Sequence, residues 1–248
     1  MTYRQSLRWG LSLAFRHKID REILSEIKTA GISAIELSFS QDDYMNTIDF
    51  PNQWHRIADL VREFEIELWS IHLPFSTELD ISHLDDRRRK MTLQTHQVLI
   101  EAAGKAGIQV AVLHPSSEPI QDQERSERLT RSREAIIRLN AVCAQHNLRL
   151  AVENLPRTCL CNWSAEMITL LQGTGAGVVF DTNHALVEDN IAFLSALAES
   201  NLMIHSLHIS DYDRVDERHR LPGDGVNDWN GIFVQLQRAG YSGPMMYE

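Results

Sequence analysis

Lysine, cysteine and long apolar runs are all scarce in this chain of 248 residues. The four lysines, at positions 18, 28, 90 and 105, lie in predicted helices or past the first predicted strand, which argues against a Schiff-base lysine inside the fold. The three cysteines form no even, spaced disulfide framework, which favours a reducing compartment. No run approaches the roughly 18 apolar residues of a membrane span, and the N-terminal region holds no continuous apolar segment. The sequence therefore predicts a cytoplasmic protein with no membrane partner.

Charge and glycine patterns exclude further classes of protein. With 24 Lys+Arg against 34 Asp+Glu, the formal net charge of −10 opposes non-specific attraction to nucleic acid, so no nucleic-acid partner is expected. No Gly-x-Gly-x-x-Gly or Walker-type loop follows an apolar run, which weakens a nucleotide-binding interpretation. The Gly-x-Ser-x-Gly elbow of serine hydrolases is absent as well. The chemistry is therefore sought among carboxylate and imidazole side chains.

Short apolar runs alternate with longer amphipathic stretches along the whole chain, which is typical of βα units on a parallel sheet. Eight runs are predicted as strands, at Trp9–Phe15, Ala34–Phe39, Leu68–Leu73, Val110–His114, Leu150–Glu153, Val178–Asp181, Ile204–Ile209 and Met245–Glu248. Eight repeats in this length favour an α/β fold of the (β/α)8 TIM-barrel type over a doubly wound open sheet, with residues 1–248 forming one domain.

The ends of the predicted helices fit this pattern. Gly31, Gly107 and Gly240 stand where helices should stop. The chain ends with the eighth predicted strand, so the last helix of the barrel is predicted to be missing, either because the chain is truncated there or because something else covers that side. A missing helix would leave apolar surface that invites a partner, and a homo-oligomer is therefore considered.

Side chains capable of binding metal gather at the ends of these runs. In barrels of parallel strands, reactive side chains lie at the carboxyl ends of the strands. The residues at or just beyond those ends are His72, His114, Glu153, Asp181, His184, His208 and Glu248, and His219 lies in the loop after the seventh strand. Glu153, Asp181, His208 and Glu248 form the candidate metal cage, because an ionised carboxylate is rarely buried without a partner cation.

Three carboxylates and one imidazole make a hard, oxygen-rich set of ligands. Such a set favours one divalent ion of the Mn²⁺ type, with Mg²⁺ or Co²⁺ as alternatives, whereas a larger share of histidine would favour Zn²⁺. The alternative interpretation is a salt-bridge network in which Glu153 and Asp181 pair with rim arginines such as Arg157. Acids buried at several successive strand ends argue against that alternative.

Alternation along each strand predicts which side chains enter the barrel. With Glu153 facing inward, Ala151 shares its face. His205 and His208 lie on opposite faces, and His208, nearer the strand exit, is the one expected at the barrel mouth. Glu36 is placed inward, either to bind a substrate hydroxyl or to pair with a rim arginine. The same alternation turns Trp69 away from the face of His72, so packing in the core or against the helices is an alternative to a substrate contact for this side chain.

These strand ends resemble the xylose-isomerase-like barrels, which include sugar isomerases and epimerases, inosose-type dehydratases and the endonuclease IV enzymes. The resemblance covers essentially the whole chain. Its anchors are Ile71-His-Leu-Pro74, Leu113-His-Pro115, Val152-Glu-Asn154, Phe180-Asp-Thr-Asn-His184, Leu207-His-Ile-Ser-Asp211, His219-Arg-Leu-Pro-Gly-Asp-Gly225 and the terminal Glu248. These motifs are specific for the superfamily and weak for the substrate.

Resemblance to the ketohexose 3-epimerases implies that Glu153, Asp181, His208 and Glu248 hold the metal. It also implies that Glu153 and Glu248 are catalytic and exchange protons with the sugar carbon next to the carbonyl, while the cation lowers the cost of an enediolate. His184 and Arg214 are implied to contact substrate, and His72, His114 and His219 are expected to bind substrate hydroxyls. The lysine that assists hydride shift in xylose isomerases has no counterpart at a strand end, which favours proton transfer.

Two rival reactions remain open at this point. A dehydratase or other lyase would use the same enediolate, with His114, Glu118 or His219 as the acid at the departing hydroxyl. An endonuclease IV-like zinc phosphodiesterase would use the strand-end histidines as additional ligands, and Glu217-Arg-His219 stands where that family has Asp-x-His. The acidic balance and the lack of Lys/Arg-rich loops disfavour the nuclease, because DNA affinity comes largely from phosphate contacts. The sequence therefore predicts a metal-dependent sugar isomerase or epimerase with a small-molecule substrate. Trp69, Phe75, Trp163 and Trp229 are candidate walls for the sugar.

Overall fold

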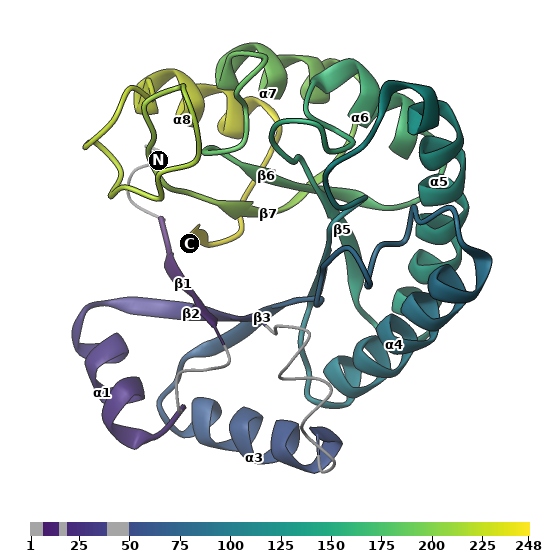
Figure 1. The fold of residues 1–248 in the computed structure, drawn as a ribbon. Coiled ribbons are helices and arrows are strands. Elements are labelled where there is room, and N and C mark those ends of the chain that lie inside the picture. The colour runs from purple at the N-terminus through teal and green to yellow at the C-terminus, as the bar shows by residue number, and fades with distance from the viewer. Residues whose placement is uncertain (1–6, 15–18, 39–49) are drawn as a thin grey trace.

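Eight parallel strands form a nearly closed barrel with helices as its outer layer (Figure 1). The structure is a computed structural model that describes residues 7–14, 19–38 and 50–248. Its strands are β1 (Trp9–Ala14), β2 (Ile32–Ser38), β3 (Glu67–His72), β4 (Val110–Leu113), β5 (Arg149–Glu153), β6 (Gly177–Asp181), β7 (Ile204–His208) and β8 (Met245–Tyr247). Each predicted strand is present, and its ends within the described residues are shifted by at most two residues, so the predicted (β/α)8 barrel is confirmed. Phe15 and Phe39, the predicted ends of the first two strands, lie outside the described residues.

The helices follow the strands in regular alternation. They are α1 (Arg21–Thr29), α3 (Phe50–Glu63), α4 (Asp86–Lys105), α5 (Asp122–Gln145), α6 (Ser164–Leu171), α7 (Asn190–Glu199) and α8 (Trp229–Arg238). Aspartate side chains cap α1, α4 and α7 by accepting hydrogen bonds from backbone N–H groups of the first turn, which have no partner inside a helix. Gly31, Gly107 and Gly240 follow α1, α4 and α8 with φ of +79°, +80° and +69°, so the predicted helix stops are confirmed.

The last segment of the chain brings the barrel close to closure. Helix α8 is short and connects β7 to β8, which pairs with β1 in parallel register. On the other side, Ile209 forms a single parallel bridge to Tyr247, and its N–H donates to the carbonyl of Met246 at 2.7 Å. Glu248 therefore ends the chain beside the carboxyl end of β7. Within the described residues, no helix has the length and apolar character needed to cross a membrane.

Apolar side chains are buried in two separate places. The larger cluster lies between strands and helices and includes Leu150 and Val152 of β5. The smaller one has mainly short side chains and consists of Ala34, Trp69, Val110, Val112, Ala151, Val179 and Met246. The predicted inward face of Ala151 is confirmed by its place in this inner cluster.

Trp69 packs in the core, as one alternative predicted, but the side of the strand predicted from alternation was wrong. Ile35 pairs with Leu68 and Glu36 pairs with Ser70, so Trp69 has no partner in the register and is a bulge in β3. A bulge shifts the alternation of side chains by one residue. The indole enters the barrel, and its Nε1 donates to Ser206 Oγ of β7 at 3.2 Å.

Candidate active site

The carboxyl ends of the last four strands bring the candidate metal cage together. Glu153 and Asp181 end β5 and β6, His208 ends β7, and Glu248 follows β8. One potential ligand atom from each of these four residues lies within 4.8 Å of the others. The first three are buried and Glu248 is half-buried, so the cluster opens toward solvent on the side of Glu248. Segments up to 95 residues apart thus converge as the strand-end pattern predicted.

His208 lies at the centre of the cage. Its Nδ1 atom is 2.6 Å from Glu248 Oε2, 2.8 Å from Glu153 Oε1 and 3.8 Å from Asp181 Oδ2. Carboxylate oxygens of ionised acids only accept hydrogen bonds. One imidazole nitrogen facing three acids therefore satisfies them incompletely, which leaves a strongly negative centre.

Asp181 provides an independent test of whether a cation fits. Its Oδ2 atom is buried without a hydrogen-bond partner, whereas Oδ1 accepts from the backbone N–H of Asn183. A buried carboxylate oxygen without a donor is costly, and a cation would remove that cost. The donor set is three carboxylates and one imidazole, which fits a hard divalent ion such as Mn²⁺, Mg²⁺ or Co²⁺.

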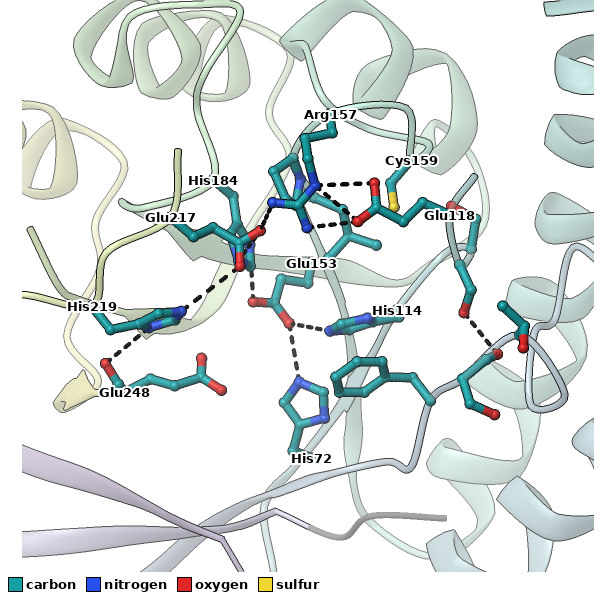
Figure 2. Close-up of a pocket in the computed structure, with 17 residues that line it drawn as sticks. His72, His114, Glu118, Glu153, Arg157, Cys159, His184, Glu217, His219 and Glu248 are labelled. Atoms are coloured by element: carbon teal, nitrogen blue, oxygen red, sulfur yellow. Dashed lines mark hydrogen bonds and ion pairs between the residues drawn. The ribbon is translucent and has the colours of Figure 1, made fainter. Parts of the chain in front are cut away.

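Two further histidines orient the other oxygen of Glu153. The Nε2 atoms of His72 and His114 each lie 3.2 Å from Glu153 Oε2 (Figure 2). The ring of Phe75 stacks on His114 with centroids 3.7 Å apart at an angle of 24°. Glu153 is thus fixed between His208 on one oxygen and this imidazole pair on the other, which points its carboxylate into the pocket.

The charges of these groups depend on one another. Burial alone would raise the pKa of Glu153, but the positive charge of His208 and hydrogen bonds from the neighbouring imidazoles hold it well below its usual range. Burial also opposes ionisation of Glu248, yet the charge of His208 lowers its pKa to about 2. Asp181 differs, because burial raises its pKa to about 6. Burial lowers the pKa of His72, but Glu153 and nearby carboxylates raise it to about 9.

Glu217 and two histidines extend the site toward the loop after β7. His184 Nδ1 lies 2.9 Å from the carbonyl oxygen of Asn154, and its Nε2 is 4.0 Å from Glu217 Oε1. His219 Nε2 is 3.8 Å from Glu217 Oε2, and its Nδ1 is 3.3 Å from the carbonyl oxygen of Glu248. All three side chains line the pocket, where they face the half-exposed side of the cage (Figure 2).

Arg157 ties together the loops at the mouth of the pocket. Its guanidinium lies 2.6 Å from Glu118, 2.9 Å from Asp216 and 2.8 Å from Glu217, which belong to the loops after β4 and β7. These contacts differ from the alternative salt-bridge network, in which rim arginines would pair with Glu153. Sequence reasoning missed this cluster, because its acids come from loops whose mutual placement no strand pattern specifies.

The pocket beside the cage has a volume of about 340 Å³. Of the predicted substrate-binding residues, His72, His114, His184 and His219 line it. Glu36 is fully buried below His208 and does not line it. The substrate contacts predicted for all five residues stay predictions.

Arg214 and most of the candidate aromatic walls lie away from this pocket. The Arg214 guanidinium is half-exposed and pairs with Asp189 at 2.6 Å. Phe75 lines the pocket, whereas Trp163 lies beneath the guanidinium of Arg125 at 4.8 Å. Trp229 donates its indole N–H to Asp211 at 2.9 Å, outside the pocket lining. Phe75 is therefore the predicted aromatic wall that the structure brings to the site, and substrate contact by Arg214 stays a prediction.

These features define a (β/α)8 barrel with an acidic candidate metal centre at the carboxyl ends of its strands. The model of the xylose isomerase-like TIM barrel family matches residues 24–248, so the chain belongs to that family. The uncharacterized protein MJ1311 of Methanocaldococcus jannaschii is 24% identical to it over 98% of this chain and 83% of the relative.

Solved structures of sugar epimerases share the fold. A D-tagatose 3-epimerase-like protein matches with a TM-score of 0.83 at 21% identity, over 97% of this chain and 90% of that chain. The D-psicose 3-epimerase of Clostridium cellulolyticum H10 matches with a TM-score of 0.80 at 18% identity, over 98% of this chain and 84% of that chain. The fold of this protein is therefore one that sugar epimerases and isomerases use.

Proposed function

We propose that this protein is a divalent-metal-dependent isomerase or epimerase of a sugar or sugar derivative that works by proton transfer. The observation that carries the proposal is the convergence of Glu153, Asp181, His208 and Glu248 within 4.8 Å beside an open pocket. The unpartnered Oδ2 atom of Asp181 supports a cation at this place. The fold shared with ketose 3-epimerases supports the substrate class.

A divalent ion held by these four residues would polarise the substrate carbonyl and its neighbouring hydroxyl, which lowers the cost of an enediolate. The residues of this chain then have separate tasks. Glu153 and Glu248 move the proton: one carboxylate removes it from the carbon next to the carbonyl, and the other delivers a proton to that carbon. Both acids are held ionised by His208, so either can act as the base. The carboxylate that delivers a proton must first take one up from solvent, and the one that acted as the base returns its proton to solvent, so no net proton is gained or lost.

The remaining pocket residues position the substrate and the bases. His72 and His114 fix the orientation of Glu153 through its Oε2 atom. His184 and His219 face the open side of the cage, where they can donate to or accept from sugar hydroxyls. The ring of Phe75 offers an apolar wall for the C–H face of a sugar.

Metal analysis of the purified protein tests the first half of the proposal. We expect one ion per chain, with Mn²⁺ restoring activity best after chelation and Mg²⁺, Co²⁺ or Zn²⁺ as the other candidates. About three zinc ions per chain would instead favour an endonuclease IV-like phosphodiesterase. A protein that binds no divalent ion would overturn the metal-dependent mechanism.

Isotope exchange tests the second half. In heavy water, a panel of ketoses and sugar acids is incubated with the Mn²⁺-loaded protein, and deuterium at the carbon next to the carbonyl is followed by NMR. Proton transfer predicts incorporation of solvent deuterium into substrate and product, whereas a hydride shift predicts none. Loss of a hydroxyl from the product would indicate a dehydratase that uses the same enediolate.

A further inference from the structure

Glu36 lies below the cage rather than in the pocket. This β2 residue is fully buried, and its Oε1 atom is 3.0 Å from His208 Nε2. Ser12 Oγ of β1 donates to Oε1 at 2.9 Å, and Ser70 Oγ of β3 donates to Oε2 at 2.7 Å. Residues from three adjacent strands thus meet the imidazole of β7 inside the barrel.

This arrangement gives the two nitrogens of His208 different surroundings. Nε2 faces Glu36, whereas Nδ1 faces Glu153, Asp181 and Glu248. A nitrogen that binds a cation must offer a lone pair and carry no hydrogen, so a cation in the cage would be bound by Nδ1. The remaining hydrogen of the imidazole would then lie on Nε2, where the Glu36 carboxylate accepts it. Glu36 thus holds the ring with Nδ1 turned toward the cage.

We propose that Glu36 is a positioning residue that fixes the orientation of His208 for cation binding. The inference rests on the proposed metal-dependent function and adds a residue to it. Carboxylates that accept the second N–H of a ligating histidine hold the ring in place and increase its strength as a ligand. The hydroxyls of Ser12 and Ser70 in turn donate to the Glu36 carboxylate, so a hydrogen-bond network extends from β1 to β7.

The burial of Glu36 separates this role from substrate binding. Its side chain is 0% exposed and both of its oxygens are already hydrogen-bonded. A substrate in the pocket would have to displace His208 to reach it. Glu36 thus faces inward as predicted from strand alternation, but it lies beneath His208 and not in the pocket.

The decisive experiment is a Mn²⁺ titration of the purified full-length protein and its Glu36→Gln variant by calorimetry. Glutamine keeps the shape of the side chain and removes its charge. We expect the variant to bind Mn²⁺ about 10- to 100-fold more weakly than the wild type. Glu67→Gln is the matched control, because Glu67 begins the neighbouring strand β3 and pairs with Arg8 at the other end of the barrel. It should leave Mn²⁺ affinity unchanged.

A second readout concerns the histidine itself. Nitrogen-15 NMR of the protein loaded with diamagnetic Mg²⁺ should show hydrogen on Nε2 of His208 in the wild type and a shifted Nε2–H signal in Glu36→Gln, because the hydrogen bond to the carboxylate is replaced. A purely structural role of Glu36 would not move this signal. If Glu36→Gln fails to fold, the double variant Ser12→Ala with Ser70→Ala keeps the carboxylate and removes its anchors. Weaker Mn²⁺ binding by that variant is then expected.

The outcomes distinguish the positioning role of Glu36 from the proposed metal-dependent function. Equal Mn²⁺ affinity of wild type and Glu36→Gln, with an unchanged Nε2–H signal, would overturn the positioning role and leave the proposed function in place. A wild-type protein that binds no Mn²⁺ would overturn the proposed function and the positioning role together.

Discussion

The two ends of the barrel interior contain opposite kinds of side chain. At the carboxyl ends of the strands, three acids surround His208, and one buried oxygen of Asp181 lacks a hydrogen-bond partner. Toward the other end, the inner cluster is apolar and includes small residues such as Ala34 and Ala151. The carboxyl end carries acidic groups without enough hydrogen-bond partners, which a ligand could supply. The other end is filled by apolar side chains. The proposed function and the apolar packing thus lie in different halves of one interior: an upper half at the carboxyl ends of the strands and a lower half toward their other ends.

Trp69 shows how the lower half is filled. The guanidinium carbons of Arg8 and Arg149 lie 5.5 Å and 5.2 Å from its ring centroid, within the range of cation–π contacts. Its indole N–H is satisfied by Ser206. This large side chain, turned inward by the bulge, occupies space that the short side chains leave. We therefore expect substitutions in the two halves to have different effects.

The largest effect is expected from Glu153→Gln and Glu248→Gln. Each variant removes one of the two proposed proton-transfer groups and one acid of the cage, so turnover should fall by roughly 10³-fold or more. The unfolding midpoint of the metal-free variants should fall at neutral pH, because the ionised carboxylates, whose pKa values His208 lowers, stabilise the folded state. Steady-state kinetics and thermal melting measure the two quantities. Full turnover in either variant would contradict the proposed pair of carboxylates.

Trp69→Ala is expected to lower stability without lowering turnover. Removing a buried tryptophan typically costs about 3–5 kcal/mol of unfolding free energy, because it leaves a cavity. Urea denaturation at 25 °C measures this loss. Turnover per folded molecule should change little, since Trp69 is separated from the pocket lining. A comparable loss of turnover at intact stability would show that the two halves are not independent.

Asp181→Asn sharpens the comparison within the upper half. Burial raises the pKa of Asp181 to about 6, whereas its unfolded-state value is near 3.9. The folded protein therefore binds this proton more tightly, and stability is lost as the pH rises through the window from about 4 to 6. With metal removed by chelation, Asp181→Asn should be more stable than the wild type at pH 8, on the order of 2 kcal/mol. The difference should shrink at pH 5, and melting curves at both pH values check it.

Added Mn²⁺ should reverse that ranking. The ion is expected to stabilise the wild type, because a ligand that binds the folded state raises its stability. Asp181→Asn lacks one ligand, so its melting temperature should rise less. A larger rise in the variant would contradict the assignment of Asp181 to the cage.

The fold and the cage were largely predictable from the sequence. Alternating apolar and amphipathic segments specify the barrel, because each strand and each helix must bury one face. The cage followed because parallel strands present their carboxyl ends at one rim, where Glu153, Asp181, His208 and Glu248 had to meet. Local patterns were sufficient wherever geometry repeats from one βα unit to the next.

Features that depend on irregular backbone were not predictable in this way. The bulge at Trp69 shifts the alternation in β3, and its only trace in the sequence is an aromatic residue of unusual size for an inner position. The depth of Glu36 depends on the register between β2 and β7 across the barrel, which single strands do not encode. The Arg157 cluster joins three loops whose paths are set by tertiary contacts. Sequence alternation therefore gave the direction of Glu36 but not its partner.

The smallest predicted effect compares two arginines of the loops above the barrel. Arg157 and Arg214 both have left-handed backbone, with φ of 52° and 63°, and both pair with acids at the surface. Arg157 lines the pocket and holds Glu217, whereas Arg214 pairs with Asp189 outside the lining. Arg157→Gln should therefore raise KM by about 10-fold with little change in kcat, because Glu217 loses the contact that fixes it beside the substrate. Its unfolding free energy should change by less than about 1 kcal/mol, as for exposed ion pairs.

Arg214→Gln is the matched control for this prediction. The backbone conformation and the chemical change are the same, so any difference in KM reports the position of the side chain. From the contacts of Arg214 we expect an unchanged KM. A rise in KM for Arg214→Gln with none for Arg157→Gln would mean that the loop after β7 rearranges when substrate binds. Arg214 would then have the substrate contact that resemblance to the ketohexose 3-epimerases implies. The ion pairs of Arg157 with Glu118, Asp216 and Glu217 would have to break during the catalytic cycle.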